Sequence, residues 1–174
     1  MKRLLLLIFC LLGLTVFSQH EDINELTIEE KNEELRETLD WLKSKMSSQF
    51  VIRLKDYSLC CNLNYDSNEP SKITISNYNC ETNEEISIST FDLKDIHRFS
   101  FGYTFYGGYK FIMLETPKEE GLILIDKGNG EIFTSNTEFI PYDDLVSDAK
   151  MTKVLNYALE LARERKDLSS INIK

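Results

Sequence analysis

The chain has 174 residues, a length typical of one domain of ordinary size. Apolar residues make up 42% and charged residues 28%, and only three prolines and seven glycines occur, which excludes a disordered tail, a collagen-like repeat and long flexible linkers. Lys and Arg total 20 against 29 Asp and Glu, a net charge of −9, which argues against partners that are bound through their phosphates. Nucleic acid and anionic lipid are therefore not expected as ligands.

The first 18 residues have the pattern of a secretory signal peptide. Two positive charges precede an apolar run from Leu4 to Val16, and a small residue, Ser18, follows before the sequence turns polar. The run is shorter than the ~20 residues of a membrane span, so we expect cleavage between Ser18 and Gln19 and no membrane attachment afterwards. Loss of Lys2 and Arg3 would leave 18 basic and 29 acidic residues, a net charge of −11. The expected location is the periplasm or the outside of the cell.

A short mobile lead-in over residues 19–25 is expected to precede the first helix. Thr27 and Glu30 form a T-x-x-E capping box, and apolar residues recur every three or four positions after it. This pattern predicts an amphipathic helix from Ile28 to Ser47, with Trp41 at the edge of its buried face.

From Phe50 to Phe133 the hydrophobic period is two, which predicts antiparallel strands. Turn-forming residues separate the strands, and the pair Gly107-Gly108 suits a two-residue hairpin turn. A single helical turn is expected over Phe91–Ile96, inside one connection. The strands are expected at Phe50–Leu54, Tyr57–Tyr65, Lys72–Tyr78, Glu85–Phe91, Arg98–Tyr106, Tyr109–Glu115, Leu122–Asp126 and Glu131–Thr134.

The helical period returns after Pro141 and predicts a final helix from Asp148 to Arg165, capped by Ser147 or Asp148, followed by a polar tail over residues 167–174. Residues 26–166 are therefore expected to form a single α+β domain. It would have an N-terminal helix, an antiparallel meander of seven or eight strands forming a bent sheet or roll, and a C-terminal amphipathic helix.

Two resemblances accompany this prediction. The order of elements from Phe50 to Arg165 resembles that of the pleckstrin-homology-like roll. The leader ending in Phe17-Ser18-Gln19 resembles those of exported Bacteroidota proteins, and the helix that bears Trp41, the turn at Asp92–Ile96 and the last helix resemble exported Bacteroidota domains of unknown function. These resemblances imply a shared fold and no particular activity.

Motifs for cofactors and metals are not found. A phosphate-binding loop needs glycines at fixed spacing followed by Lys and Ser or Thr, and none occurs. The segment from Asp126 to Glu131 suggests a calcium loop, but Gly128 and Gly130 occupy two ligand positions and Thr137 stands where a bidentate Glu is needed. Cys60 and Cys61 are adjacent on a strand and point to opposite faces, so one zinc ion cannot easily bind both. No cofactor and no metal are expected.

The predicted register of the strands also separates the cysteines. A turn over Asp66–Ser71 would place Leu63 opposite Ile73 and Cys60 opposite Ser76, about 13 Å from Cys80 at 3.3 Å per residue. A disulfide needs Cα atoms roughly 4.4 to 6.8 Å apart. We therefore expect no bridge between Cys60 and Cys80, and a buried Cys61 thiol facing Ile75.

The only credible imidazole base is His97, because His20 lies in the lead-in. Possible thiol nucleophiles are Cys60, Cys61 and Cys80, and the possible orienting carboxylates are those of Asp92 and Asp95.

Aromatic residues in the predicted hairpin over residues 98–115 point to a binding face. One side is expected to face the core, with Phe99, Phe101, Tyr103, Phe105, Ile112 and Leu114. The other side is more apolar than a solvent face needs, so either the first helix covers it or a partner binds it. Its candidate binding residues are Tyr106, Tyr109, Phe111 and Met113.

The sequence thus favours an exported, acidic, non-enzymatic binding protein. Its ligand would be a basic protein patch, a peptide along a sheet edge or a small molecule in the mouth of the roll. Two alternatives stay open: a small hydrolase that uses His97, and an inhibitor or immunity-type protein whose acidity steers a basic partner.

Overall fold

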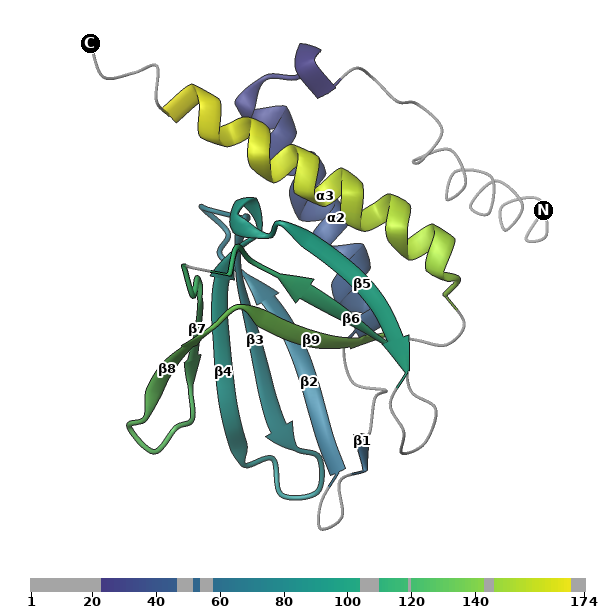
Figure 1. Ribbon diagram of the computed structural model, residues 1–174. Coiled ribbons are helices and arrows are strands. Elements are labelled where there is room, and N and C mark those ends of the chain that lie inside the picture. The colour runs from purple at the N-terminus through teal and green to yellow at the C-terminus, as the bar shows by residue number, and fades with distance from the viewer. Residues whose placement is uncertain are drawn as a thin grey trace, which may run out of the picture.

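The structure is a computed structural model of the chain, and it describes residues 23–46, 52–53, 58–103, 110–118, 120–142 and 146–169. It confirms the α+β class, with one long helix before and one after a set of antiparallel strands (Figure 1). The predicted leader lies outside the described residues.

The first long helix, α2, covers Ile28–Met46 and follows the short 3-10 turn η1 at Ile23–Glu25. The predicted capping box is confirmed: the backbone N–H of Thr27 donates to the Glu30 carboxylate at 2.8 Å, and the N–H of Glu30 donates to the Thr27 hydroxyl at 3.3 Å. Trp41 is half-buried beside the core, with the ammonium groups of Lys45 and Lys150 over its ring. The buried apolar stripe of the helix consists of Leu35, Leu39, Leu42 and Met46.

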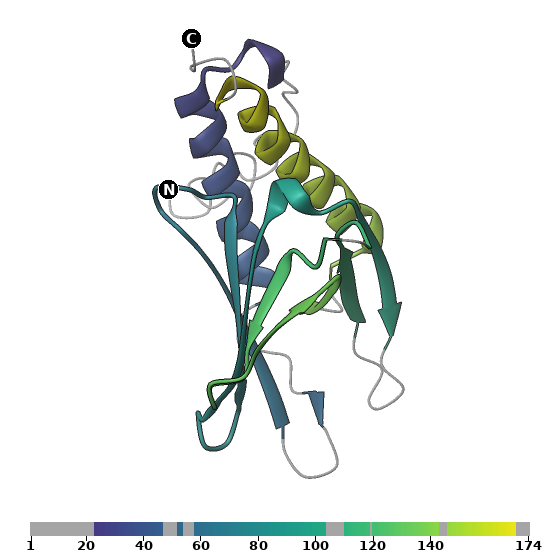
Figure 2. The ribbon, with the colours of Figure 1, turned by 60° about the vertical axis from the view of Figure 1, so that its left-hand side comes forward.

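The last helix, α3, covers Asp148–Ser169 and so extends four residues beyond its predicted end at Arg165. It packs antiparallel against α2, as an ion pair between Lys31 near the start of α2 and Glu164 near the end of α3 shows. The two helices lie side by side at one end of the molecule, and the strands extend away from them (Figures 1 and 2).

The described strands form two sheets and not the single continuous meander that the sequence suggested. The six-stranded sheet has the order β1-β2-β3-β4-β7-β8, and the three-stranded sheet has the order β5-β6-β9. The chain leaves the larger sheet after β4, builds the β5–β6 hairpin, and returns to pair β7 with β4. The strands are β1 (Ile52–Arg53), β2 (Ser58–Tyr65), β3 (Lys72–Asn79), β4 (Glu85–Asp92), β5 (Arg98–Tyr103), β6 (Lys110–Glu115), β7 (Ile123–Asp126), β8 (Ile132–Ser135) and β9 (Thr137–Tyr142).

The predicted helical turn after β4 is confirmed as the 3-10 turn η2 at Leu93–Asp95. The Asp92 side chain caps it by accepting a hydrogen bond from the N–H of Lys94 at 3.2 Å.

The prediction that Cys60 and Cys80 stay unbridged is wrong, because the two form a disulfide with Cα atoms 5.2 Å apart. The β2–β3 register differs by two residues from the predicted one: Cys60 lies opposite Tyr78, and Cys61 lies opposite Asn77 and not Ile75. Cys80 directly follows β3, at the start of a turn that bends the chain toward β4.

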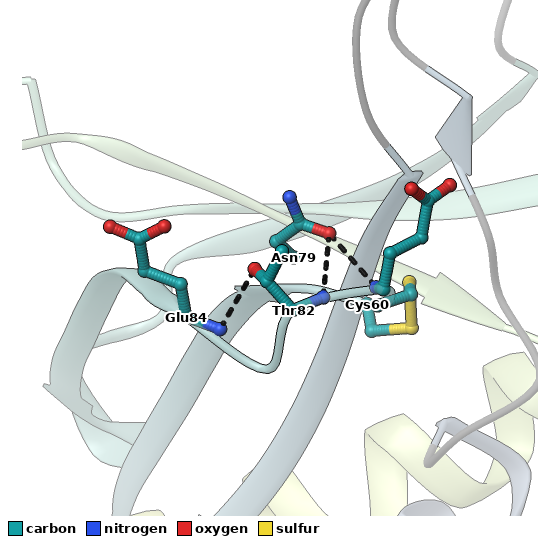
Figure 3. The surroundings of a disulfide bond; sticks show 6 residues. Cys60, Asn79, Thr82 and Glu84 are labelled. Atoms are coloured by element: carbon teal, nitrogen blue, oxygen red, sulfur yellow. Dashed lines mark hydrogen bonds between the residues drawn. A yellow bond between two sulfur atoms is a disulfide. The ribbon is translucent and has the colours of Figure 1, made fainter.

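The side chain of Asn79 holds this turn, as Figure 3 shows. Its oxygen accepts hydrogen bonds from the N–H groups of Glu81 at 2.9 Å and Thr82 at 3.3 Å. The hydroxyl of Thr82 in turn accepts from the N–H of Glu84 at 3.3 Å. Cys80 lies inside this hydrogen-bonded turn, within reach of Cys60.

The core lies between the two helices and the inner faces of both sheets. Leu63, Ile73 and Ile75 come from the larger sheet and Ile112 and Leu114 from the smaller one, and all are buried. Cys61 is the buried free thiol that the sequence predicted. One charged group also enters this layer, since the Ser89 hydroxyl on β4 donates a hydrogen bond to the Glu138 carboxylate on β9.

Candidate functional site

The outer face of the three-stranded sheet is the candidate binding surface. In the β5–β6 pairing Gly102 lies opposite Phe111 and Ser100 opposite Met113, and in the β6–β9 pairing Met113 lies opposite Phe139. These residues share one face because residues opposite each other in a ladder point to the same side. We call Phe111, Met113 and Phe139 the aromatic face.

Gly102 makes room for Phe111, whose ring lies over the glycine backbone. A Cβ atom at residue 102 would come within 2.4 Å of the Phe111 ring, so any side chain there would displace it. The Phe111 ring also packs edge-to-face against Phe139, with ring centroids 5.4 Å apart. The Phe111 ring is therefore held in place from two sides, while Phe139 is 50% exposed.

Neither of the two long helices in the described part of the chain closes over the aromatic face. Helix α2 packs against α3, β2 and β9, and the β9 residues that join its core are Ile140 and Tyr142, on the opposite side of the sheet from Phe139. Phe111 and Met113 stay partly exposed and Phe139 half-exposed. Of the two possibilities left by the sequence, coverage by the first helix does not occur for these three side chains.

The inner side of the same sheet is core, as predicted for most of its residues. Phe99 and Phe101 pack against the buried cluster, and Phe101 contacts Tyr142 edge-to-face with centroids 5.8 Å apart. Tyr103 departs from the prediction, because its side chain is 61% exposed at the end of β5. Phe105 lies outside the described residues.

Two of the four predicted binding residues, Phe111 and Met113, lie together on the aromatic face. The other two, Tyr106 and Tyr109, lie outside the described residues, as does the Gly107-Gly108 turn. Phe139 was missed, because the segment before Pro141 was not predicted to be a strand. The available signal is the short apolar run from Phe139 to Tyr142.

An ion pair lies at one end of the outer face. Arg98 binds the Glu115 carboxylate with two hydrogen bonds, at 3.1 Å from Nε and 2.6 Å from Nη2. This contact lowers the pKa of Glu115, mainly through the hydrogen bonds from Arg98. The pair contributes no net charge, so recognition at the aromatic face is expected to depend on apolar contact.

The alternative site around His97 is a polar cleft of about 460 Å³ at the junction of η2 and β5. The Arg163 guanidinium donates to the carbonyl oxygen of Ile96 at 2.6 Å, and the backbone N–H of His97 donates to the carbonyl oxygen of Glu115 at 2.7 Å. None of the residues that line the cleft carries a hydroxyl or a thiol. They are Lys94, Asp95, Ile96, His97, Pro117, Glu120, Leu122 and Arg163.

The three candidate thiols lie away from His97. Cys60 pairs with Tyr78, and Tyr78 lies six residues along β3 from Lys72, the residue that pairs with Asp92 just before η2. Six residues of strand correspond to about 20 Å. Cys60 and Cys80 are bound to each other, and burial raises the pKa of the Cys61 thiol to about 12, with a further contribution from Glu138. Of the predicted orienting carboxylates, Asp95 lines the cleft and Asp92 pairs with Lys94.

Among the described residues, no three side chains of His, Cys, Asp or Glu gather closely enough to hold a metal ion. Neither helix in the described part of the chain combines the length and the apolar character that a membrane span requires.

Comparisons of the chain with protein-family models, with curated proteins and with solved structures find no match.

Proposed function

We propose that this protein is an exported, non-enzymatic binding protein that holds a protein or peptide partner on the aromatic face. The observation that carries the proposal is the half-exposed Phe139 beside Phe111 and Met113, on a sheet face that neither described long helix covers. Aromatic and methionine side chains are typical of the centres of protein interfaces, where they bury large areas. The leader pattern supports export, and the net charge of −11 that the chain would have after loss of residues 1–18 favours a partner with basic surface around the contact.

The hydrolase alternative has less support. Its cleft brings His97 together with Arg163 and Lys94, but the nucleophiles considered for it lie elsewhere or are bound in a disulfide. An inhibitor or immunity-type role is a form of the same binding proposal and differs only in what the partner does.

The test is Phe139→Ala. If Phe139 contacts the partner, this variant should weaken the partner's binding by about 1 to 4 kcal/mol, the range of interface hot spots. Its melting temperature should change little, because half of the side chain is already in water. The partner is recovered from the native cell envelope by cross-linking, and its affinity is then measured by titration.

His97→Ala is the matched control, since it removes an exposed ring at a different place on the molecule and should leave the affinity unchanged. Phe111→Ala is a less clean test, because its ring also packs on Gly102 and its loss lowers stability. Equal binding by Phe139→Ala and the unaltered protein would contradict the proposal. Loss of function in His97→Ala at an unchanged melting temperature would make the hydrolase the better hypothesis.

A further inference from the structure

Strand β8 forms one edge of the six-stranded sheet, and no described strand pairs with its outer side. Edge strands present unpaired backbone N–H and C=O groups that can pair with another extended chain. Proteins commonly prevent such edges from pairing with other chains by means of prolines, bulges or charged side chains. Strand β8 reads Ile-Phe-Thr-Ser and has none of these within its span.

The β7–β8 register shows which groups point away from the sheet. The backbone N–H of Lys127 donates to the carbonyl oxygen of Glu131 at 3.1 Å, which makes this a hydrogen-bonded pair. Such pairs recur at every second residue of an antiparallel ladder, so Phe133 is hydrogen-bonded to its partner Ile125. The N–H and C=O groups of Ile132 and Thr134 therefore point outward.

The side chains along this edge are also accessible. Ile132 is 67% exposed and Phe133 is 43% exposed, and the two point to opposite faces of the sheet because they are adjacent on a strand. An added strand could thus cover apolar surface on both faces while its backbone pairs with β8.

The charges near this edge are mainly acidic. Asp126 lies opposite Ile132, and Glu131 directly precedes β8. Lys127, the residue after Asp126, is paired with Glu131 and lies over the Phe133 ring. An approaching basic chain would meet the exposed carboxylate of Asp126, which forms no ion pair within the part of the chain that the structure describes.

We propose that the outer edge of β8 binds an extended basic segment of a partner protein by strand addition. A second copy of this chain is the less suitable occupant, because each copy carries a net negative charge and two copies repel each other.

This site is separate from the aromatic face, because β8 belongs to the other sheet. Its test therefore gives a result that is independent of Phe139→Ala.

The probe is an eight-residue peptide of alternating lysine and valine with blocked ends, and the readout is amide hydrogen exchange measured by NMR. In the free protein the amides of Ile132 and Thr134 should exchange fast and that of Phe133 slowly, because only the last is hydrogen-bonded to β7. With the peptide bound, the exchange of Ile132 and Thr134 should slow by about tenfold or more. A peptide of alternating glutamate and valine should bind about tenfold more weakly.

Thr134→Pro supplies the matched variant. Proline is tolerated on an edge strand where the N–H faces solvent, so this variant should keep the β7–β8 pairing and weaken peptide binding by about tenfold. Thr134→Val retains the N–H and should bind within about twofold of the unaltered protein.

Unchanged exchange at Ile132 and Thr134 in the presence of bound peptide would overturn the proposal even if Thr134→Pro failed to fold. Peptide binding by folded Thr134→Pro at full affinity would also overturn it. Protection of the two amides that grows with protein concentration in the absence of peptide would assign the edge to a second copy and refute the basic partner.

Discussion

Glu138 is a carboxylic acid placed in the layer between two sheets. Its side chain is only 7% exposed and accepts hydrogen bonds from the Ser89 hydroxyl and from the N–H of Phe139, the latter at 3.2 Å. Burial raises its pKa, and the two hydrogen bonds partly offset this effect. No cation of the described residues pairs with it, and an unpaired buried carboxylate is costly, so Glu138 weakens the fold when it is ionised.

Glu138→Gln should therefore raise the melting temperature at pH 7. The pKa of Glu138 is higher in the folded than in the unfolded chain, so the folded state binds the proton more tightly. The contribution of this group to stability is thus present below the unfolded pKa of 4.5 and is lost as the pH rises through the folded value. Glutamine removes that loss and can still accept both hydrogen bonds.

Thermal melts of Glu138→Gln and the unaltered protein at pH 4 and pH 7 measure the effect. The gain should be larger at pH 7 than at pH 4. Glu120→Gln, the same chemical change at an exposed position, should show no such difference. A gain of equal size at both pH values would show that the carboxylate charge is not what destabilises the fold.

The sequence predicts which side chains of a strand face the core more accurately than it predicts which residues lie opposite each other in neighbouring strands. The β2–β3 register was expected to place Leu63 opposite Ile73 and is found with Leu63 opposite Ile75. In the β5–β6 hairpin, a two-residue turn at Gly107-Gly108 predicts Phe101 opposite Leu114, and Phe101 lies opposite Ile112. Both differences are two residues. A slip of two leaves every side chain on its predicted face, whereas a slip of one would invert them.

The β9 strand was missed for a local reason. The sequence pattern suggests a break at Pro141 before the last helix, but Pro141 lies within β9, at the edge of the smaller sheet, where a missing N–H costs no ladder hydrogen bond. The aromatic face was therefore predicted with two of its three described residues. The third residue, Phe139, lies on β9, and the sequence pattern does not show that this distant strand pairs with β6.

A two-residue error in the predicted β2–β3 register is the reason that the sequence does not predict the disulfide between Cys60 and Cys80. A bridge between residues 20 apart is expected to stabilise the fold by about 3 kcal/mol, mainly by restricting the unfolded chain. The double variant Cys60→Ser, Cys80→Ser should melt roughly 6 to 12 °C below the unaltered protein.

Reducing agent provides the control for this test. It should lower the melting temperature of the unaltered protein to about that of the double variant and leave the double variant unchanged. Peptide mapping without reduction should find Cys60 joined to Cys80 and Cys61 free. Equal melting temperatures with and without the bridge would mean that the Asn79 turn holds this end of β3 without covalent help.

In the molecule as a whole, the division of the strands into two sheets could not be predicted from the sequence pattern. Local periodicity predicts strands but does not say whether a strand pairs with its neighbour in the chain. Here β4 pairs with β7 across the inserted β5–β6 hairpin, and β6 pairs with β9 across the β7–β8 hairpin. These two non-local pairings separate the sheets and leave the aromatic face and the β8 edge on different sheets.

We expect the protein to be exported and to lose residues 1–18. The short apolar run after two positive charges is typical of a cleaved leader. Export would also place Cys60 and Cys80 in a compartment that permits their disulfide.

Mass spectrometry of protein recovered outside the cytoplasm should find an N-terminus at Gln19. Replacing Leu6 and Leu11 with arginine should block export, because charge in the apolar run prevents its recognition as a leader. Recovery of the intact chain with Met1 present would contradict cleavage and indicate a retained anchor.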